Sequence, residues 1–289
     1  MGNVEKTTSA DGTTIAFERY GEGPAAVVVG GAFCDRGAFR ELAQALGEQG
    51  LTGVTYDRRG RGKSGDTRPY AVEREIEDLT AVVEAIGAER GFAHGVSSGG
   101  ALVLRAAAAG APLAAVSTLE TPYRIEGAPP IPEDYIETLD AFNAAGDNEG
   151  TLRFFHTRAV GLPEEMLEGM KGTPMWDPML ALAPTVVYDG WCLGGNDQSF
   201  PAEMLASITV PVLSVNSTGT QLPFLREAAV KVAEATPRGR HAALEGGFHE
   251  VPAETLAPVL AEFYRAADQM SKRAADQPAA DHTSDQHEE

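Results

Sequence analysis

The first half of the chain alternates short apolar stretches with segments of helical periodicity. The apolar stretches predict strands at residues 13–20, 25–30, 51–57, 91–96 and 114–119, and the segments between them predict helices at 37–47, 72–86 and 99–109. Strands that alternate with helices of this length are typical of an α/β fold, in which a mostly parallel sheet carries helices on both faces. The glycine-rich break at residues 21–24 indicates that the first two strands form an antiparallel hairpin at the sheet edge.

The alternation stops after residue 121 and resumes after residue 206. Helical segments at 133–145, 150–160 and 163–170 fill this interval, so we expect a helical cap at 122–206 inserted into a core of residues 1–121 and 207–268. The core resumes with a strand at 210–216, a helix at 222–235, a strand at 240–244 and a last helix at 252–268. Residues 269–289 are polar, lack periodic apolar positions and are expected to form a disordered tail.

The composition excludes several classes of partner. The formal net charge is −19, from 42 acidic and 23 basic residues, so the chain should repel nucleic acid and anionic membrane surfaces. It has no apolar run of the roughly 18 residues that a membrane span needs, and its first residues do not resemble a secretory signal. Its two cysteines, Cys34 and Cys192, are too few for a disulfide framework and favour a reduced, cytoplasmic protein.

A glycine-rich stretch at residues 60–65 matches a nucleotide-binding pattern, G-x-G-x-x-G, and ends in a Gly-Lys-Ser that resembles part of a P-loop. A P-loop requires glycine where Asp57 stands, and a helix must follow it at once. Here Pro69 follows within a few residues and interrupts any such helix. We therefore expect no nucleotide cofactor, and no other cofactor or metal site is indicated.

A second short motif lies between a predicted strand and a predicted helix. Gly95-Val96-Ser97-Ser98-Gly99 matches G-x-S-x-G, and the strand at 91–96 runs directly into it. A sharp strand–turn–helix connection lifts the serine hydroxyl to the carboxyl edge of the sheet, and its glycines avoid collisions with neighbouring elements. Ser97 is therefore a candidate nucleophile.

On this motif the chain resembles the α/β-hydrolase superfamily, over residues 13 to about 265. Residues 57–64 also match its D-x-R-G-x-G-x-S turn, which is structural in the family. The stretch Gly30-Gly31-Ala32-Phe33 matches the loop that commonly begins with His-Gly, with glycine in place of histidine. The resemblance implies an α/β-hydrolase fold in which the backbone N–H groups of Ala32 and Ser98 bind the oxyanion of the reaction, with the N–H of Phe33 as the alternative to that of Ala32.

A serine hydroxyl is a weak nucleophile at neutral pH and needs a neighbouring base. His249 follows the last predicted strand and precedes the last predicted helix. The family order of serine, acid and histidine places the base at this point. The sequence and the resemblance therefore identify His249 as the candidate base.

The acid of such a site normally follows the strand predicted at 210–216. No Asp or Glu occurs at residues 204–226, so the acid has to come from elsewhere or be absent. Glu120 directly follows the strand predicted at 114–119, and some members of the superfamily use a glutamate at this place. We expect Glu120 to orient the imidazole of the base. Asp197 in the cap is the alternative acid, and a site that works without an acid stays open.

A serine at this position favours acyl transfer, because the dehalogenases and epoxide hydrolases of this fold need an aspartate there. We expect an acyl-enzyme on Ser97 and hydrolysis of a carboxylic ester or lactone, with a thioester as a further option. The same scaffold also hosts cyclases, C–C bond lyases and non-catalytic receptors, so a non-hydrolytic function is the alternative.

The expected cap is rich in methionine and aromatic residues, which suits a small hydrophobic substrate. We expect the pocket to include Phe33, Met175, Trp176 and Trp191. These side chains could instead form the core of the cap itself. The sequence does not decide the oligomeric state, and a homodimer is left open.

Overall fold

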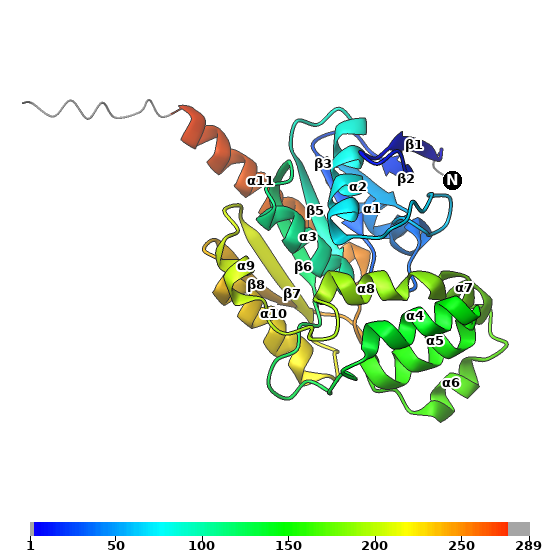
Figure 1. The fold of residues 1–289 in the computed structure, drawn as a ribbon. Coiled ribbons are helices and arrows are strands. Elements are labelled where there is room, and N and C mark those ends of the chain that lie inside the picture. Colours follow the sequence, from blue (N-terminus) through cyan, green and yellow to red (C-terminus); the bar gives the residue numbers. More distant parts are fainter. Residues whose placement is uncertain (1–2, 277–289) are drawn as a thin grey trace, which may run out of the picture.

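The protein, here a computed structural model that describes residues 3–276, is built on one eight-stranded sheet. The strand order is β1-β2-β4-β3-β5-β6-β7-β8, with antiparallel pairing only of β1 with β2 and of β2 with β4 (Figure 1). The strands are β1 (Glu5–Thr8), β2 (Thr14–Tyr20), β3 (Ala25–Val29), β4 (Thr52–Tyr56), β5 (Gly91–Val96), β6 (Leu113–Leu119), β7 (Val212–Ser217) and β8 (Gly239–Leu244). Every residue of β3, β5, β6 and β7 is buried, as expected for parallel strands covered on both faces.

The expected edge hairpin is wrong, because β4 lies between β2 and β3. Gly53 of β4 pairs with Tyr20 on one side and with Ala26 on the other. The glycine-rich break packs against the end of the following helix, where a Cβ on Gly21 would lie 2.5 Å from the Cα of Gly47. These glycines therefore serve a close backbone contact in a bend with positive φ, and they do not close a hairpin. The second neighbour of β2 is β1, at the edge of the sheet, which the polar sequence Glu5–Thr8 did not reveal.

Two layers of helices cover the sheet. On one face, α1 (Arg40–Glu48), which follows the short 3₁₀ helix η1 (Arg36–Phe39), shares an apolar core with α11 (Ala253–Asp276). On the other face lie α2 (Val72–Ala85), α3 (Ser98–Ala108) and α10 (Pro223–Ala235). None of the helices described between residues 3 and 276 is both long and apolar enough to cross a membrane.

The last helix continues beyond the expected end at residue 268. It reaches Asp276, so residues 269–276 are helical and the expectation of disorder there is wrong. The residues of this extension are mostly good helix formers, and an ion pair between Asp268 and Lys272 supports the turn. The remainder of the expected tail, residues 277–289, lies outside the described residues.

Between β6 and β7 the chain forms a helical insertion. Its elements are α4 (Tyr135–Ala145), α5 (Asn148–Phe154), the π-helical turn η2 (Phe155–Val160), α6 (Glu164–Met170), α7 (Trp176–Leu182), the 3₁₀ turn η3 (Ala183–Thr185), α8 (Val186–Leu193) and α9 (Ala202–Ala206). Helices α4 to α7 gather in one group, and α8 lies between this group and the sheet domain (Figure 1). Helices α7 to α9 were not expected from the sequence, in which Pro178, Pro184 and several glycines interrupt the helical pattern.

Candidate active site

Ser97 occupies a strained turn between β5 and α3, with φ 57° and ψ −125°. The turn depends on glycines at close backbone contacts. A Cβ on Gly95 would lie 2.2 Å from the carbonyl oxygen of Gly99, and a Cβ on Gly99 would lie 2.3 Å from that of Val29 in β3. The strand–turn–helix arrangement therefore presents the Ser97 side chain at the carboxyl edge of the sheet.

Glu120 and His249 meet at the same edge, although 129 residues separate them. The Nδ1 of His249 lies 2.8 Å from Oε2 of Glu120, whose side chain is fully buried. The other carboxylate oxygen, Oε1, accepts the backbone N–H of Ser217 at 2.8 Å. Both oxygens of Glu120 therefore have donors at the carboxyl ends of neighbouring strands, and the geometry leaves Nε2 as the free nitrogen of His249.

The alternative acid lies elsewhere. Asp197 is exposed, and its carboxylate accepts a hydrogen bond from the Ser199 hydroxyl. Among the described residues it makes no contact with His249. Glu120 is therefore the carboxylate that the fold brings to the imidazole.

Ser97 and His249 line the same cavity, which has a volume of about 750 Å³. Its walls come from the sheet edge and from the helical insertion, and apolar side chains predominate. Phe33 and Met175 line it as expected. Other lining residues that the sequence did not single out include Leu119, Arg124, Tyr135, Phe155, His156, Met179, Gln198 and Phe224.

Two of the expected pocket residues do not line the cavity. Trp176 is 4% exposed and packs within the insertion against Leu152, Leu167 and Met179. Trp191 is 45% exposed on the surface. The face that a helical side chain presents depends on how the helix packs, which residue type alone does not specify.

The loop after β3 passes directly against the nucleophile turn. A Cβ on Gly31 would lie 2.9 Å from the Cβ of Ser97, and Ala32 and Ser98 both line the cavity. The guanidinium of Arg61 donates from Nη1 to the carbonyl oxygen of Gly31 at 2.5 Å. This carbonyl and the Ala32 N–H belong to one planar trans peptide and point in opposite directions. The Arg61 contact therefore fixes the direction of the Ala32 N–H.

No three His, Cys, Asp or Glu side chains in residues 3–276 are grouped so that they could hold a metal ion.

The comparisons with known proteins identify the family. The model of the alpha/beta hydrolase family matches residues 26–282, which is most of the chain. The chain belongs to the α/β-hydrolase family. The resemblance inferred from the G-x-S-x-G motif and the fold class are thereby confirmed.

Solved structures of other proteins resemble this α/β hydrolase along nearly its whole length. An alpha/beta hydrolase from Sphaerobacter thermophilus DSM 20745 is 42% identical, with a TM-score of 0.83 over 90% of this chain and 100% of its own. A thermophilic esterase from Thermogutta terrifontis is 18% identical, with a TM-score of 0.60 over 94% and 98% of the two chains. An enol-lactonase from Burkholderia xenovorans LB400 is 19% identical, with a TM-score of 0.61 over 94% and 98%. None of the curated proteins matches the chain.

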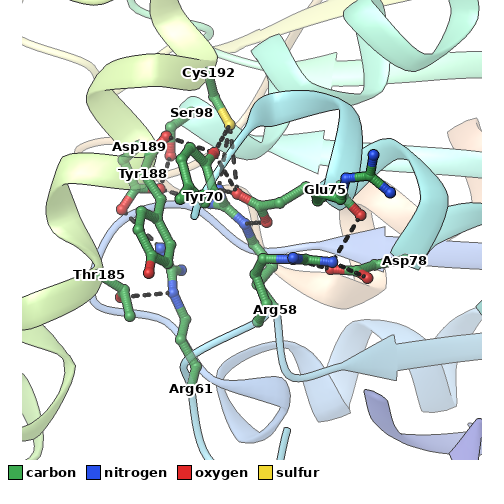
Figure 2. A network of polar contacts seen from close by, with 12 residues as sticks. Arg58, Arg61, Tyr70, Glu75, Asp78, Ser98, Thr185, Tyr188, Asp189 and Cys192 are labelled. Atoms are coloured by element: carbon green, nitrogen blue, oxygen red, sulfur yellow. Dashed lines mark hydrogen bonds and ion pairs between the residues drawn. The ribbon is translucent and has the colours of Figure 1, made fainter. Parts of the chain in front are cut away.

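A buried network of arginine and carboxylate side chains lies next to the site of this α/β hydrolase (Figure 2). Asp189 of α8 accepts hydrogen bonds from Arg58 at 2.6 Å, from Arg61 at 2.7 Å and from the Ser98 hydroxyl at 2.6 Å. Burial alone would raise the pKa of the Asp189 carboxyl, but the guanidinium groups of Arg61 and Arg58 bring it below its usual value. Asp189 therefore stays ionised and links α8 to both loops that carry the expected oxyanion donors.

Arg58 also contacts the loop after β3 and a second carboxylate. It donates to the carbonyl oxygen of Gly30 at 3.2 Å and forms two 2.6 Å hydrogen bonds to Glu75. The sequence shows these arginines only as members of a glycine-rich turn. Their partner Asp189 lies 131 residues from Arg58, and no local pattern connects the two.

Proposed function

We propose that the protein is a serine hydrolase that cleaves a carboxylic ester or lactone, with a thioester as a further substrate option. One observation carries this proposal. Ser97, on its strained turn, lines the same cavity as His249. The imidazole of His249 is hydrogen-bonded to the buried carboxylate of Glu120. A nucleophile, a base and a group that orients the base are the parts that acyl transfer requires.

In the proposed mechanism, the Oγ of Ser97 attacks the carbonyl carbon of the substrate while Nε2 of His249 takes the hydroxyl proton. The Glu120 carboxylate accepts a hydrogen bond from Nδ1–H of His249 and stabilises the imidazolium. The N–H groups of Ala32 and Ser98 stabilise the oxyanion. His249 returns the proton to the leaving oxygen, and the acyl group stays on Ser97. A water molecule, deprotonated by His249, then releases the carboxylic acid and restores the serine.

The cavity supports a substrate with a substantial apolar part. Phe33, Phe155 and Phe224 contribute aromatic surface, and several leucine and methionine side chains complete the walls. Among structures of the same fold are an esterase and an enol-lactonase, which is consistent with ester and lactone chemistry in this protein.

Covalent trapping tests the proposal. A fluorophosphonate should label the wild-type protein on Ser97, as mass spectrometry of the digested protein would show, and labelling should abolish cleavage of a short-chain 4-nitrophenyl ester. Ser97→Ala should neither label nor turn over, with kcat reduced on the order of a thousandfold or more. Ser207→Ala is the matched control, because that serine is exposed and bonds only within its own turn.

Other results would contradict the proposal. Labelling at another residue, or activity of Ser97→Ala within tenfold of the wild type, would rule out Ser97 as the nucleophile. A wild-type protein that binds esters or lactones but turns none of them over would favour a non-hydrolytic role.

A further inference from the structure

The arginines buried in the core all have carboxylate partners. Arg58 contacts Glu75 and Asp189, Arg59 contacts Asp78, and Arg61 contacts Asp189. This pairing agrees with the cost of leaving a charge without a counter-ion away from water. With 42 acidic residues in the chain, carboxylates are abundant.

Arg124 is only half-buried, and it has no carboxylate partner among the described residues. Its guanidinium donates from Nη1 to the carbonyl oxygen of Pro129 at 2.8 Å and from Nη2 to that of Ala159 at 3.0 Å. No carboxylate among the described residues lies within 4 Å of it, and its Nε is buried without a partner. Burial lowers the pKa of Arg124, whereas carboxylates raise that of Arg58 despite its complete burial. Arginine stays protonated even so, and its positive charge is uncompensated.

This charge lies at the wall of the proposed active-site cavity. Arg124 lines the cavity, and its Cζ is 5.8 Å from the ring centroid of Phe224, which lines it too. The backbone N–H of Arg124 is held at 2.8 Å by the carbonyl of Gln198, in the returning segment of the insertion. The two carbonyl contacts use one hydrogen on each Nη, and the second hydrogen on each has no partner among the described residues.

The other charged and titratable groups of the cavity do not neutralise Arg124. Glu41 of α1 and Glu250 beside the proposed base line it, but neither lies within 4 Å of the guanidinium. Asp189 lines it too, and its carboxylate is paired with Arg58 and Arg61. Burial lowers the pKa of His156, so this lining residue is neutral near pH 7. Tyr135 also lines the cavity, and burial raises the pKa of its hydroxyl, which therefore stays neutral.

We propose that Arg124 supplies the anion subsite of this cavity and that the substrate is an ester or lactone carrying a carboxylate remote from the reacting carbonyl. This inference rests on the proposed function and adds a substrate class to it. A carboxylate offers the counter-ion that Arg124 lacks, and the planar guanidinium can bind it through both Nη atoms. Glu41 and Glu250 would repel the same group, so the charges of the cavity also fix which end of the substrate approaches Arg124.

Two matched substrates test the proposal. The 4-nitrophenyl monoester of adipic acid carries a free carboxylate, and its methyl ester is neutral and nearly identical in length. The wild type should favour the acid in kcat/KM, and Arg124→Met should lower that preference by about 10- to 100-fold, since hydrogen bonds to charged groups are worth this much. The kcat/KM for the neutral ester is the reference in each variant, so the ratio of the two substrates isolates the contribution of the carboxylate.

Arg158→Met is the matched control. Arg158 lies in η2 of the same insertion, is exposed and does not line this cavity, so the substitution removes an equal charge without touching the subsite. It should keep the wild-type preference. If both variants lose the preference equally, the effect is one of overall charge and the proposal is wrong. An unchanged preference in Arg124→Met would also overturn it.

Two further measurements separate the possible failures. If Arg124→Met does not fold, Arg124→Gln, whose amide can still donate to one of the carbonyls, must show the same loss of preference. If the wild type cleaves neither ester, the proposed function fails, and calorimetric titration with monomethyl adipate then tests the subsite alone. Binding to Ser97→Ala that disappears in Ser97→Ala/Arg124→Met would support the subsite, and equal binding or none to both would refute it.

Discussion

Replacing Glu120 by glutamine is the most informative perturbation, because both carboxylate oxygens act as acceptors. One accepts the Ser217 N–H and the other faces Nδ1 of His249, each at 2.8 Å. Glutamine has one acceptor oxygen and one donor group. If the amide oxygen keeps Ser217, its NH₂ group faces Nδ1 and selects the tautomer with the proton on Nε2, which cannot take the proton of Ser97. If the amide group is flipped instead, its NH₂ group faces the backbone N–H of Ser217, and neither donor has an acceptor.

The magnitude follows from these contacts. If His249 keeps its proton on Nδ1, as catalysis requires, two buried N–H donors lose their acceptors, at a free-energy cost of about 1–3 kcal/mol each. The charge-assisted hydrogen bond between the carboxylate and the imidazolium, worth about 1.5–3 kcal/mol, is lost as well. The lower bounds alone amount to about 3.5 kcal/mol, and each 1.36 kcal/mol is a factor of ten in rate. We therefore expect kcat to fall by roughly several hundredfold to ten-thousandfold, in line with the cost of the wrong tautomer in serine proteases.

The assay is turnover of a short-chain 4-nitrophenyl ester, with a thermal melt to show that the variant is folded. Asp197→Asn serves as the control acid. Its carboxylate is exposed and contacts Ser199, so we expect kcat within twofold of the wild type. A folded Glu120→Gln protein with kcat within tenfold of the wild type would refute the role of Glu120. If instead Asp197→Asn lost most of its kcat, the acid that orients His249 would be Asp197 of the insertion.

Two further predictions concern the buried groups around the site. Ser98→Ala keeps the backbone N–H but removes the hydroxyl bond to Asp189, so we expect kcat to fall about tenfold and Tm by a few degrees; kcat within twofold would show that this bond does not position the turn. Burial lowers the pKa of His94 to about 3 from 6.5. The unfolded chain therefore binds the extra proton first, and the stability that the neutral ring contributes above pH 6.5 is lost as the pH falls from 6.5 towards 3. Urea unfolding should show this decline in the free energy of unfolding, and His94→Phe should make its dependence on pH shallower. An identical pH dependence in both proteins would contradict the assignment of the decline to His94.

The local features of the fold could be predicted from the sequence because their causes are local. The turn at Ser97 needs glycines wherever a side chain would strike a backbone carbonyl, so motif and structure share one cause. The central strands are mostly apolar and buried on both faces, and they stand out for that reason. The place of Glu120 after β6, together with the family resemblance, led to the expectation that it meets His249, because parallel strands bring their carboxyl ends to one edge.

Features that depend on distant partners could not be predicted in this way. The four-residue strand β1 is polar, and only pairing with β2 makes it a strand. Trp176 and Trp191 are of the right type for a pocket, but helix packing turns one into the insertion and the other to solvent. Arg124 stands out only through its place in the wall of the cavity, which no local pattern reveals.

The salt bridges of Asp189 determine which part of the insertion can move when a ligand enters. Separating α8 from the sheet domain would break two ion pairs whose side chains are at most 2% exposed. Removing one partner of such a buried pair costs about 3–5 kcal/mol, so a state with α8 detached would be populated at well below one per cent. Helix α8 therefore stays attached to the sheet domain. Helices α4 to α7 have no ion pair to the sheet domain among the described residues, so any displacement on ligand entry should fall on this group. Crosslinks that immobilise α4 to α7 should therefore affect ligand entry more than crosslinks between α8 and α3.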